Sequence, residues 1–129
     1  NDLTDNYIKD RLELEVESIL TELSLDNLDH PQIDPDRIDR IFHHAFSGHY
    51  FLVRLMGDGE PVVLGSGSLR GFDLGVPEIG AGETLAFRTR GPKKELLFVL
   101  AKGFHIREKT LVVVVAEVVE EETDLFKVS

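Results

Sequence analysis

Residues 95–119, "ELLFVLAKGFHIREKTLVVVVAEVV", decide the fold of this chain. They contain two apolar runs, at 96–101 and 111–116, on either side of the polar segment "IREKT". A strand with one face in water alternates apolar and polar residues, whereas these two runs do not alternate. We therefore predict two neighbouring antiparallel strands joined by a tight turn, with both faces of each strand covered.

Three further strands are predicted before this stretch: "YFLVRL" at 50–55, "VVL" at 62–64 and "TLAFRTR" at 84–90. Gly57-Asp58-Gly59 lies between the first two and predicts a hairpin turn. A phosphate loop is disfavoured because "GSGSLRG" precedes no helix and lacks the Lys-Ser/Thr of a P-loop. A calcium loop is disfavoured because "DGEPV" supplies too few acidic ligands. The five strands predict a mostly antiparallel sheet.

Two helices are predicted before the strands. Apolar residues with a spacing of 4, 4, 3 and 4 predict a first helix from about Asp5 to Leu23: Ile8, Leu12, Val16, Ile19 and Leu23. The segment "DPDRIDRIFHHAF" at 34–46 predicts a second helix, with Asp34 as its N-cap and Pro35 at its first position. Ser47 and Gly48 would end it. We expect both helices to cover one face of the sheet.

The long segment at 65–83, "GSGSLRGFDLGVPEIGAGE", is expected to cover the other face. It is longer than most loops of a compact domain, and such loops are usually functional or cover something. Its apolar residues predict a flap that packs on the sheet. The predicted flap or ligand residues are Arg70, Phe72, Leu74 and, on the following strand, Arg88. The expected fold class is thus α+β.

Length, charge and composition exclude several classes of protein. The chain has 129 residues, which suits a single domain at 1–129, and a net charge of -10, which argues against nucleic acid as a partner. The absence of cysteine excludes disulfides and thiolate ligands. The longest apolar runs have six residues, against the roughly 20 that a membrane helix needs. The chain starts at Asn1 and ends without a stop signal, which predicts a piece of a longer protein.

Acidic residues crowd the end of the chain. Such runs usually form a solvated face, but crowded carboxylates also recruit hard divalent cations. The candidate ligands of a magnesium or calcium ion are Glu117, Glu120, Glu121, Glu122 and Asp124. No other cofactor is expected. His43, His44 and His49 are predicted to be ordinary histidines near a helix end, because adjacent helical residues point in different directions and no i, i+4 partner is present.

Catalytic motifs are not found. Ser47 and His49 lack a nucleophile elbow and an ordered triad pattern, so no enzyme activity is expected of this domain.

The order of these segments resembles the extracytoplasmic sensor domain of a two-component sensor histidine kinase. The resemblance is carried by an amphipathic first helix and by "SGHYFLVRLMGDGEPVVLGSGSL", "LAFRTRGPKKELLFVLAKGFHI" and "LVVVVAEVVEEETDLF". It implies a PAS-like, or PDC-type, domain with a five-stranded antiparallel sheet flanked by helices. It also implies transmembrane helices before and after the chain, and a place on the periplasmic or extracellular side of a bacterial inner membrane.

The resemblance further implies a homodimer and a signal. We expect the dimer contact on the first helix, through Ile8, Leu12, Val16 and Ile19. PhoQ-type members of the family sense magnesium and peptides through an acidic surface, so the signal would be a small ligand, a cation or a peptide. The kinase itself would lie in a part of the protein outside this chain. The alternative is a PAS-like ligand-binding or protein-interaction module that is not attached to a kinase.

Overall fold

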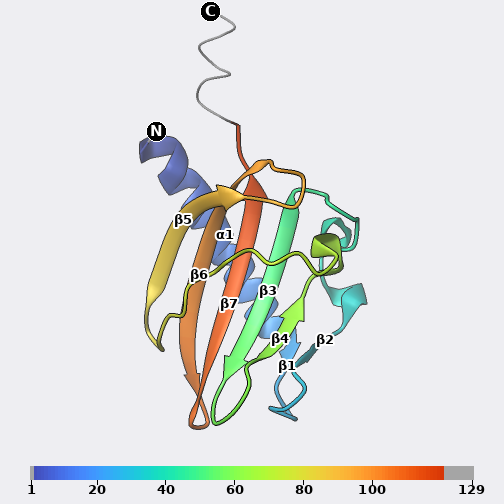
Figure 1. Ribbon diagram of the computed structural model, residues 1–129, viewed down its shortest axis with the longest axis vertical. Coiled ribbons are helices and arrows are strands. Elements are labelled where there is room, and N and C mark those ends of the chain that lie inside the picture. The colour runs from blue at the N-terminus through green and yellow to red at the C-terminus, as the bar shows by residue number, and fades with distance from the viewer. Residues whose placement is uncertain (1, 121–129) are drawn as a thin grey trace, which may run out of the picture.

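The computed structural model describes residues 2–120, with the exception of the side chain of Asp2. One α-helix precedes all the strands, and three short 3-10 helices lie between strands (Figure 1). The elements in chain order are α1 (Asp2–Glu22), β1 (Leu23–Ser24), β2 (Gln32–Ile33), η1 (Pro35–Arg37), η2 (Arg40–Phe42), β3 (His49–Met56), β4 (Val62–Gly65), η3 (Gly67–Leu69), β5 (Thr84–Arg90), β6 (Leu96–Ile106) and β7 (Lys109–Val118).

The predicted five-stranded sheet is confirmed, and each of its four strand pairs is antiparallel. The spatial order is β4-β3-β7-β6-β5, so β3 and β7, the first and last strands of this sheet along the chain, lie side by side inside it. The hairpin at Gly57-Asp58-Gly59 joins β3 to β4, and of its two glycines Gly59 has a positive φ, of 113°. A second sheet consists of the two short strands β1 and β2.

Helix α1 covers one face of the sheet, and Figure 1 shows it crossing behind the strands. Its apolar stripe packs on alternate residues of β3, β6 and β7, such as Val53, Leu100 and Val113. The four side chains assigned above to a dimer contact, Ile8, Leu12, Val16 and Ile19, are all buried in this core. That assignment is corrected here: the stripe faces its own chain, because the exposed apolar sheet offers it a surface within the same molecule.

The second predicted helix is wrong. Asp34 does act as an N-cap and accepts a hydrogen bond from the N–H of Asp36, but η1 ends after one turn. Asp39 then acts as the N-cap of η2 and accepts a hydrogen bond from the N–H of Ile41. Ile38, which lies between η1 and Asp39, is extended. Aspartate side chains compete with helical hydrogen bonds in this way. The result is two 3-10 turns, η1 and η2, in place of one α-helix.

The segment between β4 and β5 forms a flap over the other face, as predicted. It passes in front of the strands in Figure 1 and joins η3 to β5. Its residues Leu69 and Leu74 are buried against alternate residues of β6 and β7, and Phe72 is half-buried. Arg54 on β3 fixes the flap by donating hydrogen bonds to the carbonyl oxygens of Val76 and Pro77, at 3.2 and 3.0 Å.

The glycine-serine segment at the start of the flap has a structural role. Ser66 Oγ accepts a hydrogen bond from the N–H of Phe51, and Ser68 Oγ donates one to the carbonyl oxygen of His49. The two hydroxyl groups lie 2.9 Å apart and are buried. They satisfy backbone groups of β3 where β4 no longer pairs with it, since the register of β3 and β4 begins at Leu52.

Removal of a flap side chain is expected to destabilise the domain. Leu74→Ala should lower the free energy of unfolding by about 2–4 kcal/mol, because it leaves a cavity between flap and sheet. Val63→Ala, on the exposed part of β4, should cost less than about 1 kcal/mol. Urea midpoints of the two variants measure the difference. Equal midpoints would show that the flap does not form part of the core.

Candidate functional site

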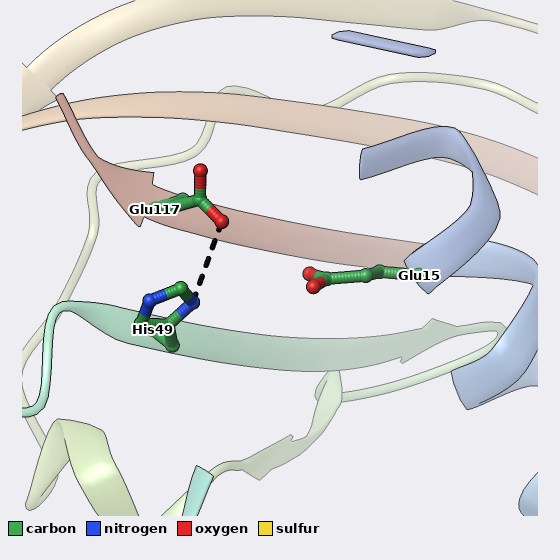
Figure 2. Close-up of side chains that lie close together, drawn as sticks. All are labelled: Glu15, His49 and Glu117. Carbon is green, nitrogen blue, oxygen red and sulfur yellow. Dashed lines mark ion pairs between the residues drawn. The ribbon is translucent and has the colours of Figure 1, made fainter. Parts of the chain in front are cut away.

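Three polar side chains from three elements meet between α1 and one end of the sheet. Glu15 comes from α1, His49 is the first residue of β3, and Glu117 is next to last in β7 (Figure 2). His49 and Glu117 are direct cross-strand partners in the β3–β7 pair. Side chains two residues apart in a strand share a face, so His49 lies on the same face as Phe51, and Glu117 on the same face as Val115. This is the face that α1 covers. Strand register and helix packing therefore bring the three groups together.

The ligand atoms of this cluster are close to one another. One nitrogen or oxygen atom from each of Glu15, His49 and Glu117 lies within 4.8 Å of the others. His49 Nδ1 is 3.4 Å from Glu117 Oε1, and the Glu15 carboxylate points into the same space (Figure 2). Glu117 Oε2 forms an ion pair with Arg11 of α1. The two oxygen atoms of Glu117 thus face different partners.

Burial and neighbouring charges shift two pKa values in the cluster. Burial raises the pKa of the Glu15 carboxyl group, Arg11 opposes this effect and Asp39 adds to it. Burial also lowers the pKa of His49, Arg11 acts in the same direction and Asp39 opposes them. Both shifts have the same main cause, since removal from water disfavours the charged form of either group. Burial therefore favours the neutral form of His49.

One oxygen atom of the cluster lacks a partner. Glu15 Oε2 is buried and has no hydrogen-bond partner among the described residues. A small cavity of about 190 Å³ is lined in part by Glu15, Ser18 and Asp39. A buried carboxylate oxygen without a donor is costly and is uncommon in folded proteins. The cluster is therefore chemically incomplete with protein atoms alone.

A separate groove lies on the flap side of the sheet. It has a volume of about 590 Å³ and runs between the flap and the strands β3 and β4. Its lining is mainly apolar, with Leu52, Val63, Leu69 and Phe72, and it includes two charged residues of opposite sign, Arg54 and Asp73. A concave surface of this size with few polar groups suits a small ligand.

The residues predicted for the flap or a ligand do not form one site. Phe72 lines the groove and Leu74 is buried beneath the flap. Arg70 is exposed, at the end of η3 with a φ of 50°. Arg88 lies on the helix side of the sheet, where it forms an ion pair with Asp5 of α1. Three of the four residues thus lie in the flap, and Arg88 lies apart from them on the helix side of the sheet.

The acidic residues predicted as cation ligands are also divided. Glu117 is buried in the cluster, whereas Glu120 is exposed. The other three, Glu121, Glu122 and Asp124, lie outside the described residues. Of the histidines, His49 belongs to the cluster, which the sequence analysis did not predict. His43 Nε2 lies 2.8 Å from the carbonyl oxygen of Pro35.

Glu15, His49 and Arg11 were missed as site residues because their signals are long-range. Alternation within each strand places His49 on the same face as Phe51, and Glu117 on the same face as Val115. Arg11 and Glu15 are four residues apart and border the apolar stripe of α1. These patterns indicate that each side chain faces the core. What the sequence does not show is the β3–β7 register that pairs His49 with Glu117.

Comparison with known protein families, with curated proteins and with solved structures found no match to this chain. Within residues 2–120, no helix has the length and apolar character to cross a membrane.

Loss of Arg11 is expected to destabilise the domain through Glu117. Arg11→Met should lower the free energy of unfolding by about 1–3 kcal/mol, below the usual effect for a buried pair because Arg11 is partly exposed. The double variant Arg11→Met/Glu117→Gln should recover part of this loss, since position 117 no longer carries an unpaired buried charge. Urea unfolding of both single variants and the double variant gives the coupling energy.

The matched control for this cycle is Arg37→Met. Arg37 pairs with Glu22 on the surface at 3.7 Å, and its side chain is 69% exposed. Exposed pairs contribute little, so the control should change stability by less than about 0.5 kcal/mol. Additive effects of Arg11→Met and Glu117→Gln would contradict a buried, coupled pair.

Proposed function

We propose that this chain is the signal-input domain of a membrane-bound two-component sensor histidine kinase. In this proposal the domain is PAS-like, lies on the periplasmic or extracellular side of a bacterial inner membrane, and passes a conformational change to a kinase elsewhere in the protein. The domain itself has no catalytic role. The resemblance in segment order suggested this function, and the arrangement of α1 and β7 supports it.

One observation carries the proposal: α1 begins, and β7 ends, at the same end of the sheet (Figure 1). The first half of α1 is tied to that end twice, by the Asp5–Arg88 ion pair to β5 and by the Arg11–Glu117 ion pair to β7. An input domain inserted between two membrane helices needs its first and last elements on one side. A direct contact between them lets movement of one element reach the other.

The groove favours the alternative function, a PAS-like module that binds a small ligand without a kinase. Its apolar lining and its volume fit a small molecule, and Arg54 supplies a positive charge close to it. Ligand binding is compatible with both functions, because a sensor also needs a ligand site. What separates the two functions is whether the protein that contains this chain phosphorylates itself on histidine.

The natural protein that contains this chain should therefore incorporate phosphate from ATP on a histidine when assayed in membrane vesicles. Arg11→Met should change the initial rate severalfold, because it breaks the contact between α1 and β7. Arg37→Met, which breaks a surface pair of α1, should leave the rate unchanged. Absence of histidine phosphorylation would reject the kinase and favour the alternative, provided that the domain still binds small molecules in a thermal-shift screen.

The proposal retains the homodimer and moves its contact to the outer face of α1. Three large apolar side chains are exposed there, with 83% of Leu3, 68% of Tyr7 and 67% of Leu14 accessible. Their spacing of four and seven residues places them on one side of the helix. A second copy of the chain is the partner that fits an input domain. Two parallel first helices in contact would transmit movement from one chain to the other.

Substitutions on the two faces of α1 should separate dimer loss from unfolding. Leu14→Glu should shift the sedimentation of the chain toward the monomer and leave its circular dichroism unchanged. Leu12→Glu should abolish the folded signal at every concentration, because Leu12 is fully buried in the core. Sedimentation equilibrium at millimolar and micromolar concentration measures the first effect. A wild-type chain that is monomeric at millimolar concentration would contradict the dimer.

A further inference from the structure

We propose that Glu15, His49 and Glu117 bind a divalent transition-metal ion of the zinc class between α1 and the sheet. This inference does not depend on the proposed function, because it follows from the side chains of the cluster alone. It also differs from the predicted magnesium or calcium site on the acidic run, with which it shares Glu117 only.

The distances in the cluster suit a shared metal ion. Ligand atoms at about 2.0–2.2 Å from a tetrahedral zinc ion lie about 3.3–3.5 Å apart. The separation of 3.4 Å between His49 Nδ1 and Glu117 Oε1 has this value, and it is longer than the 2.9 Å typical of a hydrogen bond. The Glu15 carboxylate lies within 4.8 Å of both. A small rotation of the Glu15 side chain would complete three-ligand binding, with the fourth position open to water.

The buried oxygen atom of Glu15 is an independent indication of a missing cation. Glu15 Oε2 is inaccessible to water and has no donor among the described residues. Arg11, the nearby cation on α1, pairs with Glu117, and no ion pair involves Glu15 among the described residues. A metal ion needs less room than a water molecule and would satisfy this oxygen.

Charge in and around the cluster also calls for a cation. Three carboxylates, those of Glu15, Glu117 and Asp39, act on this region against one guanidinium, that of Arg11. Carboxyl groups therefore outnumber guanidinium groups here, and a cation would favour the ionised form of Glu15.

The ligand set decides the class of metal. Magnesium and calcium prefer oxygen ligands, whereas an imidazole nitrogen favours zinc and its neighbours in the first transition row. Arg11 can stay on Glu117 Oε2 while Oε1 binds the ion, so this ion pair does not block the site.

The first test is a titration of the metal-free chain with zinc chloride, followed by calorimetry and by the melting temperature. We expect one ion per chain and a rise in melting temperature with zinc concentration. Cobalt chloride should bind at the same site and give the visible absorption of a four- or five-coordinate ion. A tenfold molar excess of magnesium should not displace either ion. Displacement of zinc by magnesium would overturn the proposal.

Variants assign the ion to the cluster. His49→Ala should weaken zinc binding by more than about 100-fold and remove the cobalt spectrum, since loss of a direct ligand exceeds the effect of losing a neighbouring hydrogen-bond partner. Glu15→Gln, on a partly exposed position of α1, should weaken binding in the same way and keep the fold. The matched control His43→Ala/His44→Ala should leave binding unchanged. Zinc binding that survives Glu15→Gln or is lost in the control would overturn the proposal.

Arg11→Met provides a readout that a structural role alone would not give. The variant is expected to be less stable than the wild type without metal, because Glu117 loses its partner. It should nevertheless bind zinc more tightly, because a positive charge close to the ion is removed. Weaker zinc binding in this variant, with the circular dichroism of the wild type, would contradict a cation at Glu117.

Discussion

The structure depends on one constraint: β6 and β7 are apolar on both faces, so both faces must be covered. Residues such as Leu100 and Val113 require a cover on one side, and Val99 and Val114 require one on the other. A sheet can be buried in this way only between two layers. The chain before β3 supplies α1 for the first face, and the long β4–β5 connection supplies the flap for the second. The arrangement of α1, sheet and flap in three layers thus follows from the apolar character of β6 and β7 on both faces.

The polar cluster is a consequence of how α1 is fixed by that constraint. The apolar stripe from Ile8 to Leu23 sets the rotation of α1, and Arg11 and Glu15 border this stripe. They are therefore carried into the edge of the core, above the end of β7. Burial of charged groups is costly, and it persists where the groups are paired or functional. Arg11 meets this need for Glu117, whereas no described residue meets it for Glu15 Oε2.

Much of the fold could be predicted from local patterns, and the errors have physical causes. The five strands, the hairpin at Gly57-Asp58-Gly59, α1 and the flap follow from periodicity and turn residues within short segments. The second helix failed because Asp39, a second cap five residues after Asp34, interrupts it. The dimer face was misassigned because an amphipathic stripe does not reveal whether its partner is the same chain. The cluster was missed because Glu15, His49 and Glu117 are far apart in the sequence and meet only through strand register and helix packing.

Strand β3 links the two sites, since its alternate residues belong to opposite faces. His49 takes part in the cluster on the helix side, while Leu52 and Arg54 line the groove on the flap side. A small molecule in the groove would press on β3, the strand that carries His49. Its partner strand β7 carries Glu117. Pairing between β3 and β7 extends from His49–Glu117 to Met56–Thr110, so a shift of β3 along its length would change the spacing of the cluster. Under the proposed function, groove and ion would therefore act on the contact between α1 and β7 as coupled sites, because each favours one position of the same strand.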